Sequence, residues 1–280
     1  DYTFLRASWG QGYRFPTIAE KFIQTVIAGG VQVIPNPNLQ SETGWTAEIG
    51  AKQGFRISSF EGFVDVSAFW SEYQDMMEFN VRFEGLSAGF QSNNVGNTVI
   101  KGIEVSVNGR GSLFGIPTTV VSGYTFIDPQ FQQFNLKGKD LPINFDASEV
   151  PVGQLNARLS TSDENILKYR FRHTAKVDVE SKFTPRISFG IALFYNSYME
   201  AIDQAFVEFE PIFNFIPGMN EFRANNNSGT AVINFRAAYF FTPKAKLSLF
   251  LKNAFNAEYS LRPGTLEAPR NIGLRFDYSF

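Results

Sequence analysis

Residues 269–280 read PRNIGLRFDYSF, and this stretch decides the fold. From Ile272 to Phe280 every second side chain is apolar, so an extended strand has one apolar face and one polar face. A half-buried strand of a water-soluble sheet shows the same alternation. The alternation recurs upstream, however, and the connections between the alternating segments differ in length in a regular order. Together these two features predict an all-β fold, an antiparallel transmembrane β-barrel.

The composition excludes several classes of protein. Aromatic residues make up 16% of the 280 residues and include 31 Phe, yet the mean hydropathy is only −0.14. No segment approaches the roughly 18 continuous apolar residues of a membrane helix, whereas membrane strands hide their apolar residues at alternate positions. The net charge of −2 argues against a nucleic-acid surface, which needs clustered Lys and Arg. The absence of cysteine excludes disulfide scaffolds and thiolate metal sites.

Ten strand-like segments follow one another along the chain. The first is expected to end at Trp9, because Gly10, Gly12 and Pro16 follow it. Beyond it, the capping-box spacing of Thr17 and Glu20 predicts a short helix over Thr17–Gln24. The ten predicted strands are Tyr2–Trp9, Glu42–Ile57, a third ending near Asn80, a fourth ending near Asn108, Ile116–Ile127, Tyr169–Glu180, Ile187–Tyr198, Gly229–Phe241, Lys246–Asn256 and Pro269–Phe280.

The connections between these strands alternate between short and long. Short ones centre on Ser58, Ser112, Thr184 and Pro243, and long ones on Gly29, Glu84, Gly138, Pro211 and Arg262. Outer-membrane barrels have short periplasmic turns and long extracellular loops. A soluble sandwich has no reason to sort its loops in this way. The pattern therefore favours the membrane barrel and places the C-terminus in the periplasm.

The polar faces of the predicted strands carry many charges. The segment Tyr169–Glu180 alone has five, at Arg170, Arg172, Lys176, Asp178 and Glu180. In a narrow barrel such charges would need dense pairing, because unpaired buried charges are costly. A wide, wet lumen or a polar plug removes that cost. We therefore expect the ten strands to be part of a larger barrel.

Six groups of residues resemble, in order, the landmarks of TonB-dependent outer-membrane receptors. Each motif is weak alone, but together they span nearly the whole chain. Ala254 departs mildly from the pattern, since the family has a larger apolar residue there. The landmarks are 10–17 (GQGYRFPT), 35–42 (PNPNLQSE), 94–97 (NVGN) with 101–104 (KGIE), 124–126 (YTF), 252–259 (KNAFNAEY), and 269–271 (PRN) with the terminal Phe280.

The resemblance implies a 22-stranded barrel, of which residues 1–280 form the C-terminal portion, with the plug and the first strands outside this segment. It further implies a Gram-negative outer-membrane importer of a scarce, bulky nutrient, driven by the TonB–ExbB–ExbD complex. A metal chelate such as a ferric siderophore is the favoured substrate. Lipid and lipopolysaccharide surround such a barrel, and a surface lipoprotein partner is left open. Phe276, Tyr278 and Phe280 correspond to the signal read by the barrel-assembly machinery.

Candidate ligand contacts lie in the long connections. Arg14, Arg82 and Arg223 are expected near the extracellular rim, where they would attract an anionic ligand. Phe206, Phe209 and Phe213 form an aromatic run that would grip an apolar group. The plainer alternatives are solvated loop charges and a loop that packs on itself. We expect no catalytic residue, no cofactor and no metal site.

Two other functions stay open at this point. A self-contained ten-stranded outer-membrane hydrolase would need a base, and His173 is the only histidine. His173 falls on the apolar side of its predicted strand, which favours an interfacial position over catalysis. A passive porin would conduct ions steadily, whereas a plugged receptor would conduct little.

Overall fold

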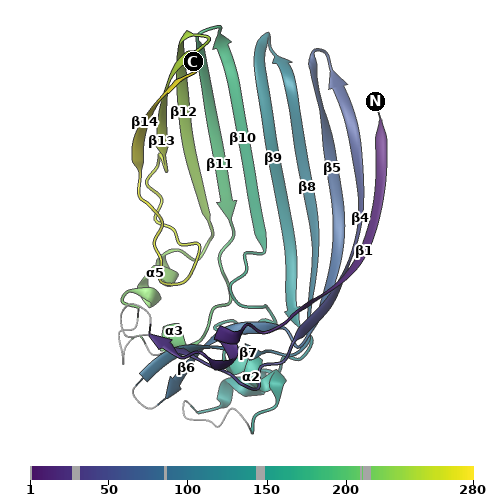
Figure 1. The fold of residues 1–280 in the computed structure, drawn as a ribbon, viewed down its shortest axis with the longest axis vertical. Coiled ribbons are helices and arrows are strands. Elements are labelled where there is room, and N and C mark those ends of the chain that lie inside the picture. Colours follow the sequence, from purple (N-terminus) through teal and green to yellow (C-terminus); the bar gives the residue numbers. More distant parts are fainter. Residues whose placement is uncertain (1, 27–31, 85–86, 143–148, 209, 211–215) are drawn as a thin grey trace.

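The computed structural model describes residues 2–26, 32–84, 87–142, 149–208, 210 and 216–280. Its main feature is a curved, ten-stranded antiparallel sheet (Figure 1) in the order β1-β4-β5-β8-β9-β10-β11-β12-β13-β14. The strands are β1 Thr3–Arg14, β4 Glu42–Ile57, β5 Phe60–Gln74, β8 Thr98–Leu113, β9 Ile116–Phe131, β10 His173–Thr184, β11 Ile187–Asn196, β12 Thr230–Thr242, β13 Ala245–Lys252 and β14 Asn271–Tyr278. The predicted ten-stranded antiparallel arrangement is confirmed.

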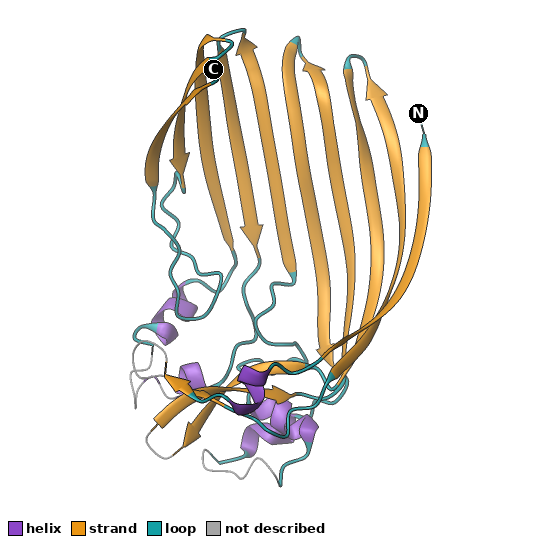
Figure 2. Ribbon diagram, viewed as in Figure 1, coloured by secondary structure: helices purple, strands orange, loops and turns teal. Residues whose placement is uncertain are grey.

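Tight turns join the strands at one end of this sheet only. Two residues separate β4 from β5, β8 from β9, β10 from β11 and β12 from β13. Ser58 and Phe114 take positive φ angles of 55° and 53° there, and Gly115 takes 81°. All the long connections leave from the opposite end (Figure 2). The predicted alternation of short and long connections is therefore present.

The strand register gives the sheet one apolar face and one charged face. In the last hairpin Leu249 lies opposite Leu274, and one residue along Ser248 lies opposite Arg275. Across the sheet, Ile49 lies opposite Ala68 in the same way. Large apolar side chains on this face are open to the surroundings, including Leu5, Trp9, Ile49, Leu274 and Phe276. Such a band suits contact with lipid.

The charges on the opposite face are paired across strands. Arg6 on β1 reaches over β4 and binds Glu48 at 3.0 Å and Asp65 at 2.6 Å. A Cβ atom at Gly50, between them, would lie 2.7 Å from the Arg6 Cζ atom. Glycine is therefore needed there for the guanidinium to lie flat over the strand.

A second group repeats this plan at the other side of the sheet. Arg236 on β12 crosses β11 to reach Asp178 at 2.6 Å and Glu180 at 3.0 Å on β10. Gly190 lies under the guanidinium, and a Cβ atom there would come within 2.4 Å of Nε. Two mixed-sign groups thus organise part of the charged face.

Several strand boundaries differ from the sequence predictions. β8 ends at Leu113 and not near Asn108, β9 at Phe131 and not at Ile127, and β13 at Lys252 and not at Asn256. Three other differences involve glycines or positive φ angles. β1 continues through its glycines to Arg14, because its pairing with β4 is unbroken over that length. Nothing lies within 4 Å of a Cβ atom at Gly10 or Gly12, so no close approach requires a glycine at either position. β5 ends at Gln74 and not near Asn80, since Asp75 turns the chain with a φ angle of 53°. β10 begins at His173 and not at Tyr169, whose φ angle is 63°.

The long connections fold together into a compact cap (Figures 1 and 2), defined here as the described parts of residues 15–41, 75–97, 132–172, 197–229 and 253–270. A second sheet in the cap, order β2-β3-β7-β6, was not predicted. It consists of β2 Thr25–Val26, β3 Gln32–Ile34, β6 Met77–Glu84 and β7 Ser87–Asn94. The helices are α1 Ile18–Phe22, η2 Leu136–Asp140, α2 Val152–Arg158, α3 Ala205–Glu208 and α5 Met219–Asn225.

The helix expected after the first strand is α1. The Glu20 amide donates to Thr17 Oγ1 at 3.2 Å, and the Thr17 amide donates to the Glu20 carboxylate at 2.8 Å, so the predicted capping box is present. Among the described residues, no helix has the length and apolar character needed to cross a lipid bilayer.

Candidate functional site

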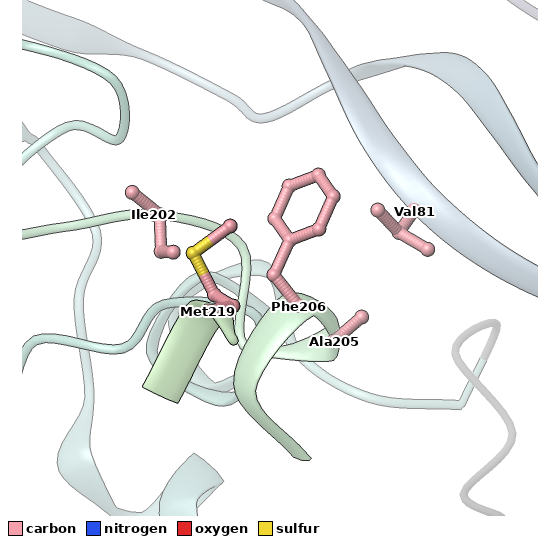
Figure 3. Packing of buried hydrophobic residues seen from close by; sticks show 5 residues of the cluster. All are labelled: Val81, Ile202, Ala205, Phe206 and Met219. Carbon is pink, nitrogen blue, oxygen red and sulfur yellow. The ribbon is translucent and has the colours of Figure 1, made fainter. Parts of the chain in front are cut away.

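A hydrophobic cluster holds the connections of the cap together. Phe206 of α3 points into it, with Val81 of β6 and Met219 of α5 around the ring (Figure 3). Ile202 and Ala205 complete the buried part. These residues come from two connections far apart in the sequence, so the cluster gives the cap a fixed interior.

A buried ionic group lies beside this cluster. Lys168 and Asp203 have exposed fractions of 2% and 0%, and Lys168 Nζ lies 3.3 Å from Asp203 Oδ2. Lys168 also donates to Asn80 Oδ1. Asp203 in turn accepts from the amides of Val81 and Ala205, each at 3.1 Å. The group links the β5–β8, β9–β10 and β11–β12 connections, and its bonds compensate for the burial of two charges.

Glu78 is the least satisfied member of this region. Its carboxylate lies 4.0 Å from Lys168 Nζ, and neither carboxylate oxygen has a hydrogen-bond partner among the described residues. Burial raises the pKa of Glu78, against the opposing effect of the Lys168 and Arg170 charges. The buried carboxyl group of Glu78 therefore keeps its proton to a higher pH than an exposed glutamate does.

A cavity of about 760 Å³ opens between three segments of the cap. It is called the larger cavity here because it exceeds the cavity that adjoins it. The chain after β11 contributes Tyr198, α5 contributes Phe222 and Arg223, and the β13–β14 connection contributes Tyr259 and Arg262. Two arginines, two glutamates (Glu221 and Glu258) and several aromatic rings thus face one space. The arginines and rings suit the anionic and the flat or apolar parts of a ligand, and the glutamates suit a cationic part.

Arg223 is held in position by backbone groups. Its guanidinium donates to the carbonyl oxygens of Met199 at 3.1 Å and Glu200 at 3.2 Å, and it lies 4.7 Å from the centre of the Tyr198 ring. Burial lowers the pKa of Arg223, yet an arginine stays charged at any physiological pH. Within the described ranges no carboxylate forms an ion pair with it. Arg223 is therefore a fixed cation with charge left for a ligand.

A smaller cavity of about 390 Å³ adjoins the larger one, and Met199, Arg262 and Pro263 line both. Phe206 contributes one edge of its ring to the smaller cavity, although its exposed fraction is only 5%. Arg262 was not identified as a candidate contact from the sequence. Its place at the centre of a long connection was the one available signal.

Of the other predicted contacts, only Arg14 has a described side chain, and it lines neither cavity. Arg14 at the end of β1 binds Glu20 at 2.5 Å, so its charge is matched within the cap. The backbone of Arg82 belongs to β6, but its side chain lies outside the described part of the structure. Phe209 and Phe213 also lie outside the described residues. Of the six candidates, Arg223 and Phe206 therefore line the cavities.

The aromatic residues proposed as an assembly signal lie at the end of the sheet that carries the tight turns. Phe276 and Tyr278 are exposed on the apolar face of β14, and the rings of Tyr278 and Phe280 meet edge to face at 5.2 Å. They form a continuous aromatic surface. Recognition of that surface by an assembly machinery stays a prediction.

His173 lies at the first position of β10, on the apolar face. Its Nδ1 atom is 2.7 Å from the Tyr124 hydroxyl, and its ring packs 5.0 Å from that of Phe126. Its backbone is hydrogen-bonded to Ser197, which lines the larger cavity, but His173 itself lines neither cavity. In the described ranges, no three His, Cys, Asp or Glu side chains converge as a metal site would require.

Comparisons with known proteins agree with this architecture. A family model described as "TonB dependent receptor-like, beta-barrel" matches residues 1–257. A comparison with curated proteins finds no match.

Three solved structures share the fold. The copper transporter OprC is 16% identical with a TM-score of 0.62, and the match covers 99% of this chain and 37% of OprC. The hemophore receptor HasR of Serratia marcescens, solved with its hemophore HasA and heme, is 14% identical with a TM-score of 0.62. That match covers 99% of this chain and 37% of HasR. The siderophore receptor PiuA of Acinetobacter baumannii is 14% identical with a TM-score of 0.60, and the match covers 99% of this chain and 34% of PiuA. The chain thus spans about a third of the length of each of these proteins, and at these identities the likeness shows the fold alone.

Proposed function

The chain belongs to the TonB-dependent receptor β-barrel family, and from this premise we propose that it supplies wall, charged inner face and extracellular cap to an active importer of the outer membrane. The observation that carries the proposal is the sorting of the connections. All long connections leave one end of the sheet and fold into a cap that contains the two cavities. A ligand captured there lies at the mouth of the wall through which it would pass.

The proposed substrate is an anionic metal chelate. Arg223 and Arg262 line the larger cavity together with Glu221 and Glu258. Arg223 is held by two backbone carbonyls and has no ion-pair partner among the described residues, so it favours a negatively charged group of the ligand. Relatives in fold are described as receptors or transporters for siderophores, for a heme-carrying protein and for copper, which makes a metal-containing cargo the natural class to test. The chain itself carries out no covalent chemistry in this proposal.

The rest of the machine is proposed on the family premise. The complete barrel has 22 strands around a plug, and the plug is displaced with energy delivered by TonB, ExbB and ExbD. The tight turns and Phe280 face the periplasm, and the cap faces outward. Lipopolysaccharide surrounds the cap, and a surface lipoprotein is an optional partner. The short turns at one end of the sheet support this orientation.

Uptake of radioactive iron tests the proposal. We would compare cells with and without the full-length protein, supplying a trianionic ferric catecholate or a neutral ferric hydroxamate. We expect uptake of the anionic chelate that requires the protein, requires TonB and stops when the proton gradient is collapsed. Uptake that persists without TonB, together with steady ion conductance in planar bilayers, would instead establish a passive porin.

A further inference from the structure

We propose that the two adjoining cavities form one site for an amphiphilic ligand, with an acidic chelating head in the larger cavity and an apolar tail in the smaller one. The identity of the head rests on the proposed function. The tail is a new element, and it rests on the chemistry of the smaller cavity. This narrows the substrate class from metal chelates in general to acidic chelates with an acyl or similar apolar substituent.

The two cavities meet but have different linings. Met199, Arg262 and Pro263 line both, so the two spaces lie side by side against the same three residues. The remaining lining of the smaller cavity consists of aromatic and aliphatic side chains: Phe79, Phe90, Tyr169, Phe206 and Leu261. Among the described residues that line it, Arg262 is the one charged side chain, and it lies where the two cavities adjoin. The other charged side chains of the described lining, Arg223, Glu221 and Glu258, lie in the larger cavity, so a ligand that fits this pattern carries its charged groups on one end.

Two of the apolar side chains that line the smaller cavity are exposed. Phe79 on β6 has an exposed fraction of 46%, and Leu261 on the β13–β14 connection has one of 42%. Burying exposed apolar surface is favourable in proportion to its area. An apolar ligand segment would cover both exposed side chains at once.

The smaller cavity leaves room beside the hydrophobic cluster of the cap. Phe206 belongs to the hydrophobic cluster of the cap and closes one side of the cavity, yet about 390 Å³ is left beside it. Small-molecule sites commonly enclose about 300–1,000 Å³. Each of the two cavities falls within that range. The space is therefore adequate for a ligand segment and larger than a packing defect, which rarely exceeds the size of a water molecule.

A matched pair of probes tests the inference. The ferric complex of a citrate–hydroxamate chelator is prepared with and without a single ten-carbon acyl chain. Binding of each complex, and of dodecyl phosphate as an iron-free amphiphile, is measured on the full-length protein in lipid nanodiscs, with empty nanodiscs subtracted for partition into lipid. Phe79→Ala is the test variant, because an exposed side chain can be truncated without opening the core. Phe22→Ala, an exposed aromatic of α1 that lines neither cavity, is the matched control.

We expect the acyl chain to tighten binding at least tenfold, since every buried methylene adds to the apolar transfer free energy. Phe79→Ala should remove most of that gain and leave the affinity for the unacylated complex within about twofold, whereas Phe22→Ala should change neither. Equal binding of the two complexes, or equal effects of the two substitutions, overturns the tail site while the proposed import of chelates stands. If only dodecyl phosphate binds and Phe79→Ala weakens it, the tail site stands and the chelate assignment fails. If none of the three binds, both are overturned.

Discussion

At the scale of single residues, Arg223 is the side chain most directly suited to binding an anion. Its guanidinium is fixed by two backbone carbonyls and has no ion-pair partner among the described residues. A hydrogen bond to a charged group contributes about 1.5–3 kcal/mol, so Arg223→Gln should weaken binding of an anionic ferric chelate roughly ten- to hundredfold. Equilibrium binding to the purified full-length protein measures this. The loss should shrink at high salt, which screens the remaining charges.

Arg14 provides the matching control. It lies in the same cap but already binds Glu20 at 2.5 Å, and it lines neither cavity. Arg14→Gln is therefore expected to leave chelate affinity within about twofold. A loss as large as that of Arg223→Gln would mean that the ligand contacts the β1 end of the cap, and it would contradict the assignment of the larger cavity.

The second residue-scale prediction concerns pH. Burial raises the pKa of Glu78 above its ordinary value of 4.5, assisted by the Asp203 and Glu42 charges and opposed by Lys168 and Arg170. The folded cap then holds this proton more tightly than the opened cap does. The contribution of this bound proton to the stability of the folded cap is complete below pH 4.5. It is lost as the pH rises through the raised pKa of Glu78. Cap opening should therefore increase with pH across that window.

Hydrogen exchange of the β6 amides, corrected for the intrinsic pH dependence of exchange, measures the opening. Glu78→Gln has nearly the same shape and does not titrate, so it should flatten the profile. An unchanged pH dependence in the variant would assign the effect to another group.

Only part of the site was visible at the residue level in the sequence. Arg223 was identified because charged residues in long connections are natural ligand contacts. Phe79 was assigned to the end of a barrel strand, and Lys168 drew no attention, although it stands between the apolar neighbours Leu167 and Tyr169. Its partners Asn80 and Asp203 lie 88 and 35 residues away in sequence. A single sequence carries no record of such distant pairings.

At the scale of elements, period-two alternation and turn length were sufficient for the main sheet. They failed for the cap sheet, where β3 pairs with β7 in parallel and β6 pairs with β7 through a short hairpin. The sequence of β7, SAGFQSNN, has the composition of a loop, because small and amide residues are depleted in strands. Its strand form is imposed by β3 and β6. Tertiary contacts therefore decided this element against its local preference.

The contact between η2 and α2 gives an element-scale prediction. A Cβ atom at Gly138 would lie 1.9 Å from the Gln154 carbonyl oxygen, whereas one at Gly153, in the same pair of elements, would meet nothing closer than 3.4 Å. Gly138→Ala should force η2 away from α2 at a cost of about 1–3 kcal/mol. Gly153→Ala should be neutral or slightly stabilising, because alanine favours a helix.

Limited proteolysis of the cap distinguishes these two variants. Cleavage between residues 136 and 158 should accelerate severalfold in Gly138→Ala and stay at the wild-type rate in Gly153→Ala. Equal rates in the two variants would show that the cap can adjust its backbone without cost at this contact.

At the scale of the whole molecule, the sheet has two free edges. β1 pairs only with β4, and β14 pairs only with β13, so in the described residues the two outer strands do not meet. Lipid offers no hydrogen bonds to such edges, and each unpaired backbone group there costs several kcal/mol. The paired charges around Arg6 on the inner face are open to solvent. Such charges suit a wide lumen, so they also favour a barrel of more than ten strands.

We therefore expect residues 1–280, exported alone, to fail to form a protease-resistant barrel, while the full-length protein succeeds. The chain has no cysteine, so Ala7→Cys in β1 and Ile272→Cys in β14 can be introduced together as a clean probe of edge pairing. In the full-length protein, strands from outside this segment should keep the two thiols apart, and oxidation should give no intramolecular bond. Efficient cross-linking in a folded, protease-resistant 1–280 would mean that β1 closes on β14. The ten strands would then form a complete small barrel, whose lumen is too narrow for the charged groups to remain wet. The self-contained hydrolase would then replace the importer as the hypothesis to test, beginning with His173→Ala.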